Sequence, residues 1–583
     1  MSDLNLIKPQ SVQNIINKFC YTIGMIPTSY KVSLTYEEQI IAIGHYLEET
    51  VIPALNNNAE AVAELQNLFI ELKNYVDNYF DNLDVQNEVN NKIDKMVQDG
   101  TLSRIINQEI FSEINNQITE NTNNIKNLQT NVQTNTNNIE ILENQKINNL
   151  RKKYYSNYTL VNLPQILSDN LFVKRTQVIT NEKGNYNLEY NISDFKNTGG
   201  TTYYISPNGS NTNDGLTPET AWSHLGKFTQ QAQNGDTAIL LNGIYTRTQV
   251  QLDTKQPCKI SCNIIGESEN GVWIKASENY DFSQNLQYEN VYQTARTNCS
   301  AVTNIINKDK GILFNLTKVN TLESCSQTEN SYYTDNTNVY VHLSDGIVPN
   351  NDNIALCLLL NQPNMFFGEF TQNTKIYIEN INFINGSNGN IVARNDTEYT
   401  CNILIKNCKL YNNNSDNYQY DSFSNIGCLS ICDNVHAINS KKDGFNYHAG
   451  TNYEARGIEL NCVAMNFGEG QTDSNKLSNN ASTSHEFSQV LSINSIYGHS
   501  NGGCVVDVQS AKRAMYNCKI FDSYGETRKY DVLAQTDAII YLYDSYLKGS
   551  IGNPNLLTSG ENAHIYYKNT EFDTSSGNVA ELI

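Results

Sequence analysis

Charged side chains are scarce in this sequence of 583 residues. Asp, Glu, Lys and Arg make up 17% of the chain, and 61 acidic residues against 40 basic ones give a formal net charge of −21. Proteins that bind nucleic acid broadly use Lys and Arg to neutralise phosphates, so this balance argues against a DNA or RNA partner. Repulsion of anionic polymers is screened beyond about 10 Å, so local contact with such a polymer is still allowed.

Long apolar runs and metal-binding motifs are absent as well. No stretch of about 18 apolar residues occurs, and residues 1–29 contain no basic-then-apolar segment, so we expect neither a membrane span nor an export signal. The 13 cysteines form no CxxC pair and no cluster with His, which argues against a disulfide framework. Nucleotide, zinc and calcium motifs are missing too, and we therefore predict no cofactor and no metal.

Helical patterning dominates the start of the chain. Thr35–Glu38 has the form of a capping box, and an apolar stripe over residues 62–79 alternates steps of three and four. We therefore predict that residues 1–108 form a helical region. One such stripe needs partner helices.

An unbroken heptad repeat follows this region. Its a positions are Phe111, Ile118, Ile125, Val132 and Ile139, and its d positions are Ile114, Asn121, Leu128, Asn135 and Leu142. Buried Asn at d lowers stability but fixes register and oligomer state. We predict that residues 109–150 form a parallel trimeric coiled coil with Asn121 and Asn135 in its core. A dimeric or intramolecular helix pair is the alternative.

The periodicity becomes strand-like after Gly200. Residues 151–200 mix short strand-like runs and end in Gly199–Gly200, which is typical of a joint. From residue 201 onward, β-rich runs alternate with turn-forming pairs such as Asn-Gly, Asp-Gly and Thr-Pro. We assign residues 151–200 as a neck and residues 201–583 as a β domain.

A strand motif closed by Asn or Asp returns throughout the second half of the chain. Its polar residues are Asn380, Asn407, Asp433, Asn461, Asn494, Asn517, Asp544 and Asn569, at intervals of 23 to 33 residues. Such a period matches one coil of a β-helix. Cys408, Cys462 and Cys518 directly follow the polar residue, which fits small side chains stacked in an interior. The sequence thus predicts a mostly β, parallel β-helix whose 33-residue coil carries the longest insertion.

Three segments resemble known families. Residues 26–102, with the core NYFDNLDVQNEVNNKIDKM (Asn78–Met96), resemble the virion-proximal part of fibre, spike and appendage proteins from phages of low-GC Gram-positive hosts. The phrases ITENTNN and VQTNTNN resemble the Asn-Thr layers of trimeric autotransporter stalks. Thr201–Trp222 and Asn234–Tyr245 are similar to the opening rungs of the pectate-lyase-like right-handed β-helix superfamily.

These resemblances imply a homotrimeric tail appendage of a virion. Residues 1–108 would attach it to tail or collar proteins, the coiled coil would join three chains, and a right-handed β-helix would contact a host cell-wall polymer.

Ionisable side chains gather between residues 436 and 507, where four of the eight histidines fall. The candidate catalytic residues are Asp443, His448, Glu469, His485, Glu486 and Asp507. Counted from the polar residue of each coil, Asp443 and Asp507 should project from a similar edge two coils apart, at roughly 10 Å. Carboxyl groups at about 6.5 to 9.5 Å suit inverting glycoside hydrolysis, and the histidines suit proton transfer or phosphodiester binding.

Tyr447, Tyr453 and Tyr497 are the candidates for stacking on sugar rings, because aromatic faces suit such contacts. The structural alternative is that the tyrosines pack, that Asp443–Gly444 is a turn, and that the histidines bond to loops. The sequence favours an enzyme that degrades a cell-surface polysaccharide or teichoic acid. The alternatives are a non-catalytic receptor-binding protein and a cellular trimeric adhesin.

Overall fold

The computed structural model describes residues 111–154, 157–164, 178–250, 258–358, 363–386, 388–413, 421–468, 478–524, 530–549 and 554–583, with isolated positions between 67 and 100. Two compact units, residues 1–149 and 150–583, are distinguished. The predicted helical region 1–108 thus lies almost entirely outside the described residues. Among the described helices, none combines the length and apolar character needed to cross a bilayer.

The heptad segment forms one continuous helix, α7 (Phe111–Tyr154). In the single chain, Asn121 and Asn135 are exposed, whereas Ile118 and Ile125 on the apolar stripe are partly covered. The Thr122 hydroxyl donates to the Ile118 carbonyl at 2.7 Å, as Thr side chains within helices commonly do. Association of this helix into a trimer stays a prediction.

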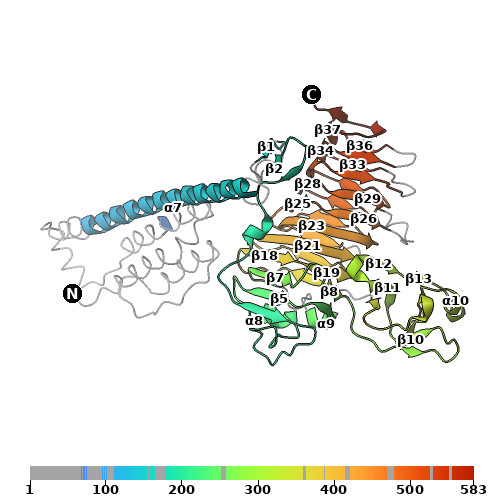
Figure 1. Cartoon of the computed structure of the whole chain (residues 1–583). Helices are drawn as coiled ribbons and strands as arrows, with labels where there is room; N and C mark the ends of the chain where they lie inside the picture. The colour runs from blue at the N-terminus through green and yellow to red at the C-terminus, as the bar shows by residue number, and fades with distance from the viewer. Residues whose placement is uncertain are drawn as a thin grey trace. The chain divides into compact units, whose positions relative to one another are not determined.

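The β domain is a parallel β-helix whose coils stack their strands in three parallel ladders, called here the first, second and third sheets (Figure 1). The first and last coils lack strands in one or two of them. The first sheet contains β4 (Thr202–Ile205), β5 (Thr237–Leu240), β7 (Cys262–Gly266), β18 (Thr374–Glu379), the first halves of β21 (Cys401–Tyr411) and β23 (Leu429–Ser440), β25 (Arg456–Leu460), β28 (Gln489–Ile493), β31 (Lys512–Tyr516), β34 (Ile539–Tyr543), β37 (His564–Lys568) and β39 (Val579–Glu581).

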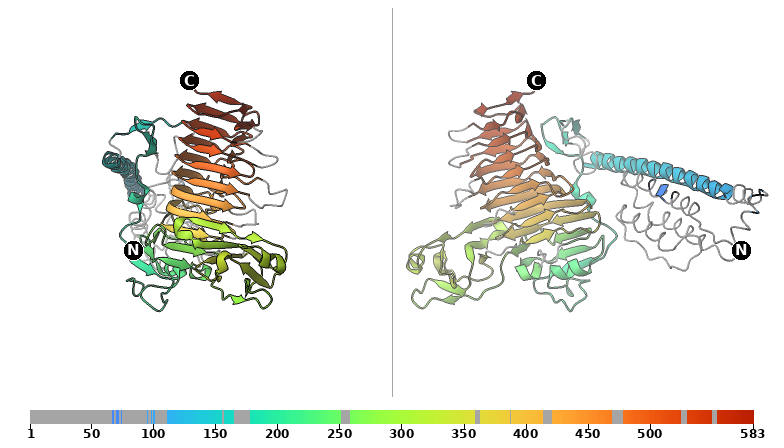
Figure 2. Two further views of the ribbon diagram at one scale, coloured as in Figure 1. Left: turned by 45° about the vertical axis from the view of Figure 1, so that its right-hand side comes forward. Right: turned by 180° about the vertical axis from the view of Figure 1, so that it is seen from behind.

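The second sheet follows the first after a short bend. Its strands are β6 (Gly243–Tyr245), β8 (Val272–Lys275), β19 (Ile381–Ile384), the second halves of β21 and β23, β26 (Val463–Phe467), β29 (Ile496–Ser500), β32 (Lys519–Phe521) and β35 (Tyr546–Lys548). The third sheet contains β17 (Met365–Phe367), β20 (Ile391–Arg394), β22 (Phe423–Ile426), β24 (Phe445–His448), β27 (Ser482–Ser484), β30 (Val505–Asp507), β33 (Val532–Gln535), β36 (Leu556–Ser559) and β38 (Ser575–Ser576). Seen from two further sides, the coils stack in sequence order toward the C-terminus (Figure 2).

The bend between the first and second sheets explains the repeated polar residue. Asn407, Asn461 and Asn494 adopt positive φ values of 51°, 53° and 51°, a region that Asn tolerates better than most residues. Their side-chain amides bond between coils; for example, Asn494 Nδ2 donates to Asn461 Oδ1 at 3.1 Å. In one coil the prediction of Asp433 was wrong, because Asn434, at φ 55°, occupies the bend.

Small side chains follow this bend into the interior, as predicted. Cys408, Cys462 and Cys518 are buried and unpaired with other cysteines. The Ser495 and Ser545 hydroxyls accept from the backbone N–H groups of Cys462 and Cys518, each at 3.1 Å. The interior stack thus alternates thiols with hydroxyls that bond to the backbone.

Part of the predicted neck, residues 151–200, covers the outer face of the first sheet. It contains β2 (Val178–Thr180), β3 (Tyr186–Leu188) and the 3-10 helix η4 (Ile192–Phe195), while β1 (Thr159–Val161) pairs with β2. Val178, Leu188 and Ile192 are buried against a row that includes Leu404 and Ile458. This outer face is therefore packed with apolar side chains rather than open to a ligand along much of its length.

A mainly antiparallel insertion separates β8 from β17, and the sequence did not predict it. Its elements are β9 (Ser283–Gln284), β10 (Tyr292–Ala295), β11 (Cys299–Asn307), β12 (Ile312–Asn315), β13 (Thr317–Lys318), α10 (Leu322–Gln327), β14 (Ser331–Thr334), β15 (Asn338–His342) and β16 (Ile354–Leu358). Ile305 and Ala355 pack on Trp273 and Ile384 of the second sheet. At the first coil, α8 (Leu225–Gln231) and α9 (Arg247–Val250) contribute Phe228 and Val250 to the interior core.

Gly457 on β25 makes room for the ring of Tyr447 across the interior. A Cβ at Gly457 would lie 2.2 Å from Tyr447 Cε1 and 2.6 Å from Cζ. Both residues belong to strands, so neither can move without disturbing a coil. We expect Gly457→Ala to lower the free energy of unfolding by about 1 to 3 kcal/mol through overpacking. Urea unfolding measures this free energy. The double variant Gly457→Ala/Tyr447→Leu should recover part of the stability that Gly457→Ala loses. A double variant that recovers none would contradict a steric clash with the Tyr447 ring.

Candidate functional site

Two histidines from neighbouring coils meet on the outer face of the third sheet. Tyr447 of β24 points into the interior, so His448 points outward, because successive side chains of a strand alternate. Tyr447 pairs with Ser484 of β27, which places His485 beside His448 one coil further on. The two imidazole rings are stacked, with centroids 4.0 Å apart and planes 12° from parallel.

Glu486 joins the pair from the bend that follows β27. Its φ of 53° turns the chain so that the carboxylate reaches back over the preceding coil. Glu486 Oε2 accepts from the Ala449 N–H at 3.1 Å and lies 3.3 Å from His448 Nδ1. Gln509 and Thr536 take similar positive φ values in the next two coils, so this conformation belongs to the bend rather than to the Glu side chain.

The electrostatics of the group follow from its partial burial. Burial, aided by the neighbouring His448, lowers the pKa of His485 to about 3. Burial acts to raise the pKa of Glu486, but hydrogen bonds from His448 and Ala449 outweigh it and lower that pKa overall. His485 is therefore neutral at pH 7 and Glu486 is ionised.

A second polar group lies at the start of the same strand. Lys442 Nζ lies 3.8 Å from Asp443 Oδ2 and 3.9 Å from Asp421 Oδ1. Asn446 Nδ2 donates to Asp421 Oδ2 at 2.8 Å and to Asp443 Oδ2 at 3.4 Å, and the Asn480 N–H donates to Asp443 Oδ1 at 2.6 Å. Two carboxyl groups are thus held around one amine and one amide, in a buried setting.

The two groups share one face of β24. Asn446 and His448 are two residues apart on this strand and point to the same side. On the next coil, Thr483 pairs with Asn446, and its Oγ1 lies 3.4 Å from His485 Nε2. The two groups therefore lie along the same face of the third sheet, with Asn446 and Thr483 between them.

Burial raises the pKa of Asp443 to about 6; Lys442 opposes this rise and Asp421 adds to it. The folded protein thus binds this proton more tightly than the unfolded chain does. The stabilisation is fully present below about pH 4 and is lost as the pH rises through 6.

We expect wild type to lose about 3 kcal/mol of unfolding free energy relative to Asp443→Asn as the pH rises from 4 to 7, because only wild type has this proton to lose. Urea unfolding across that range measures it. Asp396→Asn, on an exposed loop, is the matched control and should follow the wild-type pH dependence. Parallel curves for wild type and Asp443→Asn would contradict the raised pKa.

Of the predicted catalytic residues, the structure brings together His448, His485 and Glu486. Asp443 lies in the separate polar group at the start of the same strand. Glu469 lies outside the described residues. The prediction for Asp507 was wrong, because its carboxyl group is fully buried inside the β-helix. Counting residues from the bend could not show this, since the connections to the third sheet differ in length between coils and the in–out alternation is lost across them.

Two of the three predicted sugar-binding tyrosines were also misplaced. Tyr447 and Tyr497 are both fully buried in the interior core. Tyr453 is partly exposed, and its hydroxyl donates to the Glu398 carbonyl. Only Tyr453 could therefore contact a ligand in the way predicted.

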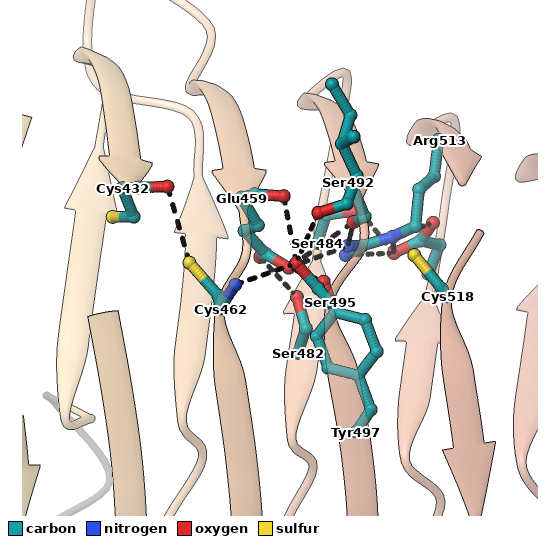
Figure 3. A network of polar contacts seen from close by, with 12 residues as sticks. Cys432, Glu459, Cys462, Ser482, Ser484, Ser492, Ser495, Tyr497, Arg513 and Cys518 are labelled. Atoms are coloured by element: carbon teal, nitrogen blue, oxygen red, sulfur yellow. Dashed lines mark hydrogen bonds and ion pairs between the residues drawn. The ribbon is translucent and has the colours of Figure 1, made fainter. Parts of the chain in front are cut away.

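Asp507 belongs instead to an ion network inside the coils. Figure 3 shows Arg513 and Glu459 of this network. Arg513, which is fully buried, donates from Nε to Asp507 Oδ2 and from Nη2 to Oδ1, each at 3.0 Å. Arg513 Nη1 lies 3.7 Å from Glu459 Oε2, and that carboxylate also accepts from the hydroxyls of Ser482 and Tyr497. Asp507 and Glu459 raise the pKa of Arg513 against the effect of its burial.

Sequence reasoning missed Arg513 and Glu459. The available signal was a charge at a strand position where neighbouring coils carry apolar residues: Arg513 pairs with Val490 and Ile540. Such a position faces the interior, and an interior charge needs a partner of opposite sign.

No family model matches this chain, and no curated protein matches it. Among solved structures, it is similar to one described as "Glycoside hydrolase" (TM-score 0.44, 9% identity, 65% of this chain and 96% of that one). It is also similar to the pectate lyase Pel9A, with a TM-score of 0.28 and 11% identity over 66% of this chain and 82% of that one. A third similar structure is the tailspike protein gp49 from Pseudomonas phage LKA1, with a TM-score of 0.24 and 9% identity over 59% of this chain and 73% of that one.

Proposed function

We propose that this chain is a phage tail appendage whose right-handed β-helix binds and cleaves a polysaccharide or teichoic acid of the host cell surface. The observation that carries the enzymatic part is the polar site on the third sheet, where Asp443, His448, His485 and Glu486 come from adjacent coils. The appendage part is supported by the resemblance of residues 26–102. In this proposal the virion is its location, tail or collar proteins are its partners, and α7 joins three copies.

The site contains the groups that cleavage of a polymer linkage needs. A glycosidic bond breaks when an acid protonates the leaving oxygen while water or a nucleophile attacks the other side. Asp443 can donate that proton because its pKa of about 6 keeps part of the population protonated near neutral pH. His448, held by Glu486 and 37% exposed at its side chain, can hydrogen-bond a substrate oxygen or the attacking water.

The covered first sheet supports placing the substrate on the third sheet. Residues 178–195 pack on the outer side of the first sheet. The insertion packs on the second sheet through Ile305 and Leu313. The third sheet is the one whose outer face carries the ionisable cluster, so a polymer lying across β24 and β27 would meet both polar groups.

A direct test exposes the purified full-length protein to wall teichoic acid, capsular polysaccharide and peptidoglycan from Gram-positive hosts. Products are sized by chromatography and weighed by mass spectrometry. We expect one polymer class to be shortened. Failure to shorten any of them, across pH 4 to 8, would overturn the enzymatic proposal.

A non-catalytic receptor-binding protein is the second candidate. It is favoured by the burial of Asp443, which is only 4% exposed, and by a pair of stacked tyrosines toward the C-terminus. Tyr541 and Tyr566, both partly exposed, stack at 5.1 Å on the outer face of the first sheet. In that case soluble polymer should bind to the protein and keep its full length.

A further inference from the structure

We propose that His448, His485 and Glu486 bind a divalent transition-metal ion such as Zn²⁺, with at least one coordination position open to solvent. This goes beyond polymer cleavage, and the site would bind metal whether or not the chain is an enzyme. The sequence predicted no metal, because the ligands come from two coils and match no spacing motif.

The positions of the ligand atoms carry the proposal. One donor atom from each of the three residues can be chosen so that all lie within 4.8 Å of one another. His448 Nδ1 lies 3.3 Å from Glu486 Oε2 and 3.4 Å from Oε1. Two ligand atoms at about 2.0 to 2.1 Å from a tetrahedral zinc ion lie about 3.3 Å from each other. His448 Nδ1 and Glu486 Oε2 already have the spacing of two ligand atoms of one zinc ion. For His485 to be the third ligand, its ring has to rotate out of the parallel stack with His448.

The stacking of the second imidazole is the independent observation. A hydrogen bond between His448 and Glu486 would account for that pair alone. It would not account for His485, whose ring lies parallel to His448 at 4.0 Å and which projects from the next coil. Because adjacent coils are spaced by about 4.8 Å, in-register histidines hold their rings within reach of one ion, which both can bind once one ring turns out of the stack.

The surroundings resemble those of a metal site that can also take a ligand. The Ala449 N–H holds Glu486 Oε2 at 3.1 Å, and Thr483 Oγ1 lies 3.4 Å from His485 Nε2, so two ligand side chains are oriented by neighbours. The side chains of His448 and Glu486 are 37% and 34% exposed, which leaves access for water. Three protein ligands plus an open position is the composition of catalytic rather than structural zinc sites.

The donor set also selects the kind of metal. Two imidazoles and one carboxylate favour Zn²⁺, Co²⁺ or Ni²⁺, whereas Ca²⁺ and Mg²⁺ prefer shells of oxygen ligands. We therefore expect transition metals to bind and Ca²⁺ not to compete at equal concentration. Competition by Ca²⁺ would overturn this assignment.

The experiment uses tag-free full-length protein that has been stripped with a chelator. Zn²⁺ binding is measured by titration calorimetry, and Co²⁺ binding by its visible absorption, neither of which depends on enzymatic activity. We expect one ion per chain, with affinity at least about 100-fold weaker in His448→Ala and in His485→Ala. Circular dichroism and thermal unfolding verify that each variant is folded.

The chain offers a matched control at His499. Its Nδ1 lies 3.0 Å from Asp522 Oδ2, which is a histidine–carboxylate pair of similar exposure on another bend. His499→Ala should leave metal affinity unchanged. Equal loss from His499→Ala and His448→Ala, or binding that survives in both site variants, would overturn the proposal. Metal binding without shortening of any polymer would overturn only the proposed enzymatic function. Shortening of a polymer by metal-free protein would show that metal binding and polymer cleavage are separate properties.

Discussion

Replacing Arg513 with Met should lower the free energy of unfolding of the β-helix by about 3 to 5 kcal/mol. Arg513 is fully buried, and it is the cation that faces both Asp507 and Glu459. Removing it leaves two buried carboxylates without their counter-charge, which costs far more than the loss of packing. Urea or thermal unfolding of the full-length chain measures the change.

The neighbouring strand position gives the control. Lys512 precedes Arg513 on β31 and points away from the interior, so Lys512→Met should stay within about 0.5 kcal/mol of wild type. A triple variant with Arg513→Met, Asp507→Asn and Glu459→Gln removes all three charges and should recover much of the lost stability. Equal destabilisation by the single and triple variants would show that packing, not charge, holds this part of the interior.

Replacing Asp443 with Asn should slow polymer cleavage by about 100- to 10,000-fold if Asp443 is the proton donor. The amide can still accept the Asn480 N–H bond that holds this side chain, so the fold should survive. The wild-type rate should decline as the pH rises above about 6, where the donor loses its proton. Initial rates on the polymer found to be shortened, measured from pH 4 to 8, test both expectations.

Two further measurements separate chemistry from structure in this variant. Polymer affinity should change much less than the rate, because the proton is needed in the transition state rather than for binding. Asp396→Asn, on an exposed loop, should keep the wild-type rate and pH profile. A rate in Asp443→Asn within about tenfold of wild type would assign Asp443 a structural role.

The periodic parts of the fold were readable from the sequence because their causes are local. The Asn residues at the bend reflect a backbone conformation that few residues tolerate, and Cys462 follows them because the interior there is narrow. The same reasoning failed at Asp433 because two polar residues are adjacent and either could take the turn. It also failed for the insertion at 276–364, because short alternating strands look the same whether they pair in parallel or antiparallel.

Only part of the candidate site could be predicted from the sequence, for a similar reason. His448 and His485 were found because histidines cluster in the sequence, and the register of β24 and β27 brings them together. The assignments of Tyr447, Tyr497 and Asp507 depended on which side of a strand each residue faces. One residue of error in a connection reverses that side, and only the folded register fixes it.

The two kinds of corner in each coil have different tolerance for change. From β18 onward the bend between the first and second sheets is at most two residues long and is tied to its neighbours by amide bonds, as at Asn461 and Asn494. The connection from the second to the third sheet varies freely in length, from Phe467–Ser482 in one coil to Ser500–Val505 in the next. New loops can therefore be gained or exchanged along this single edge, beside the ionisable cluster, while the packed interior stays the same. Descendants of such a chain could change the molecules they recognise without having to evolve a new scaffold.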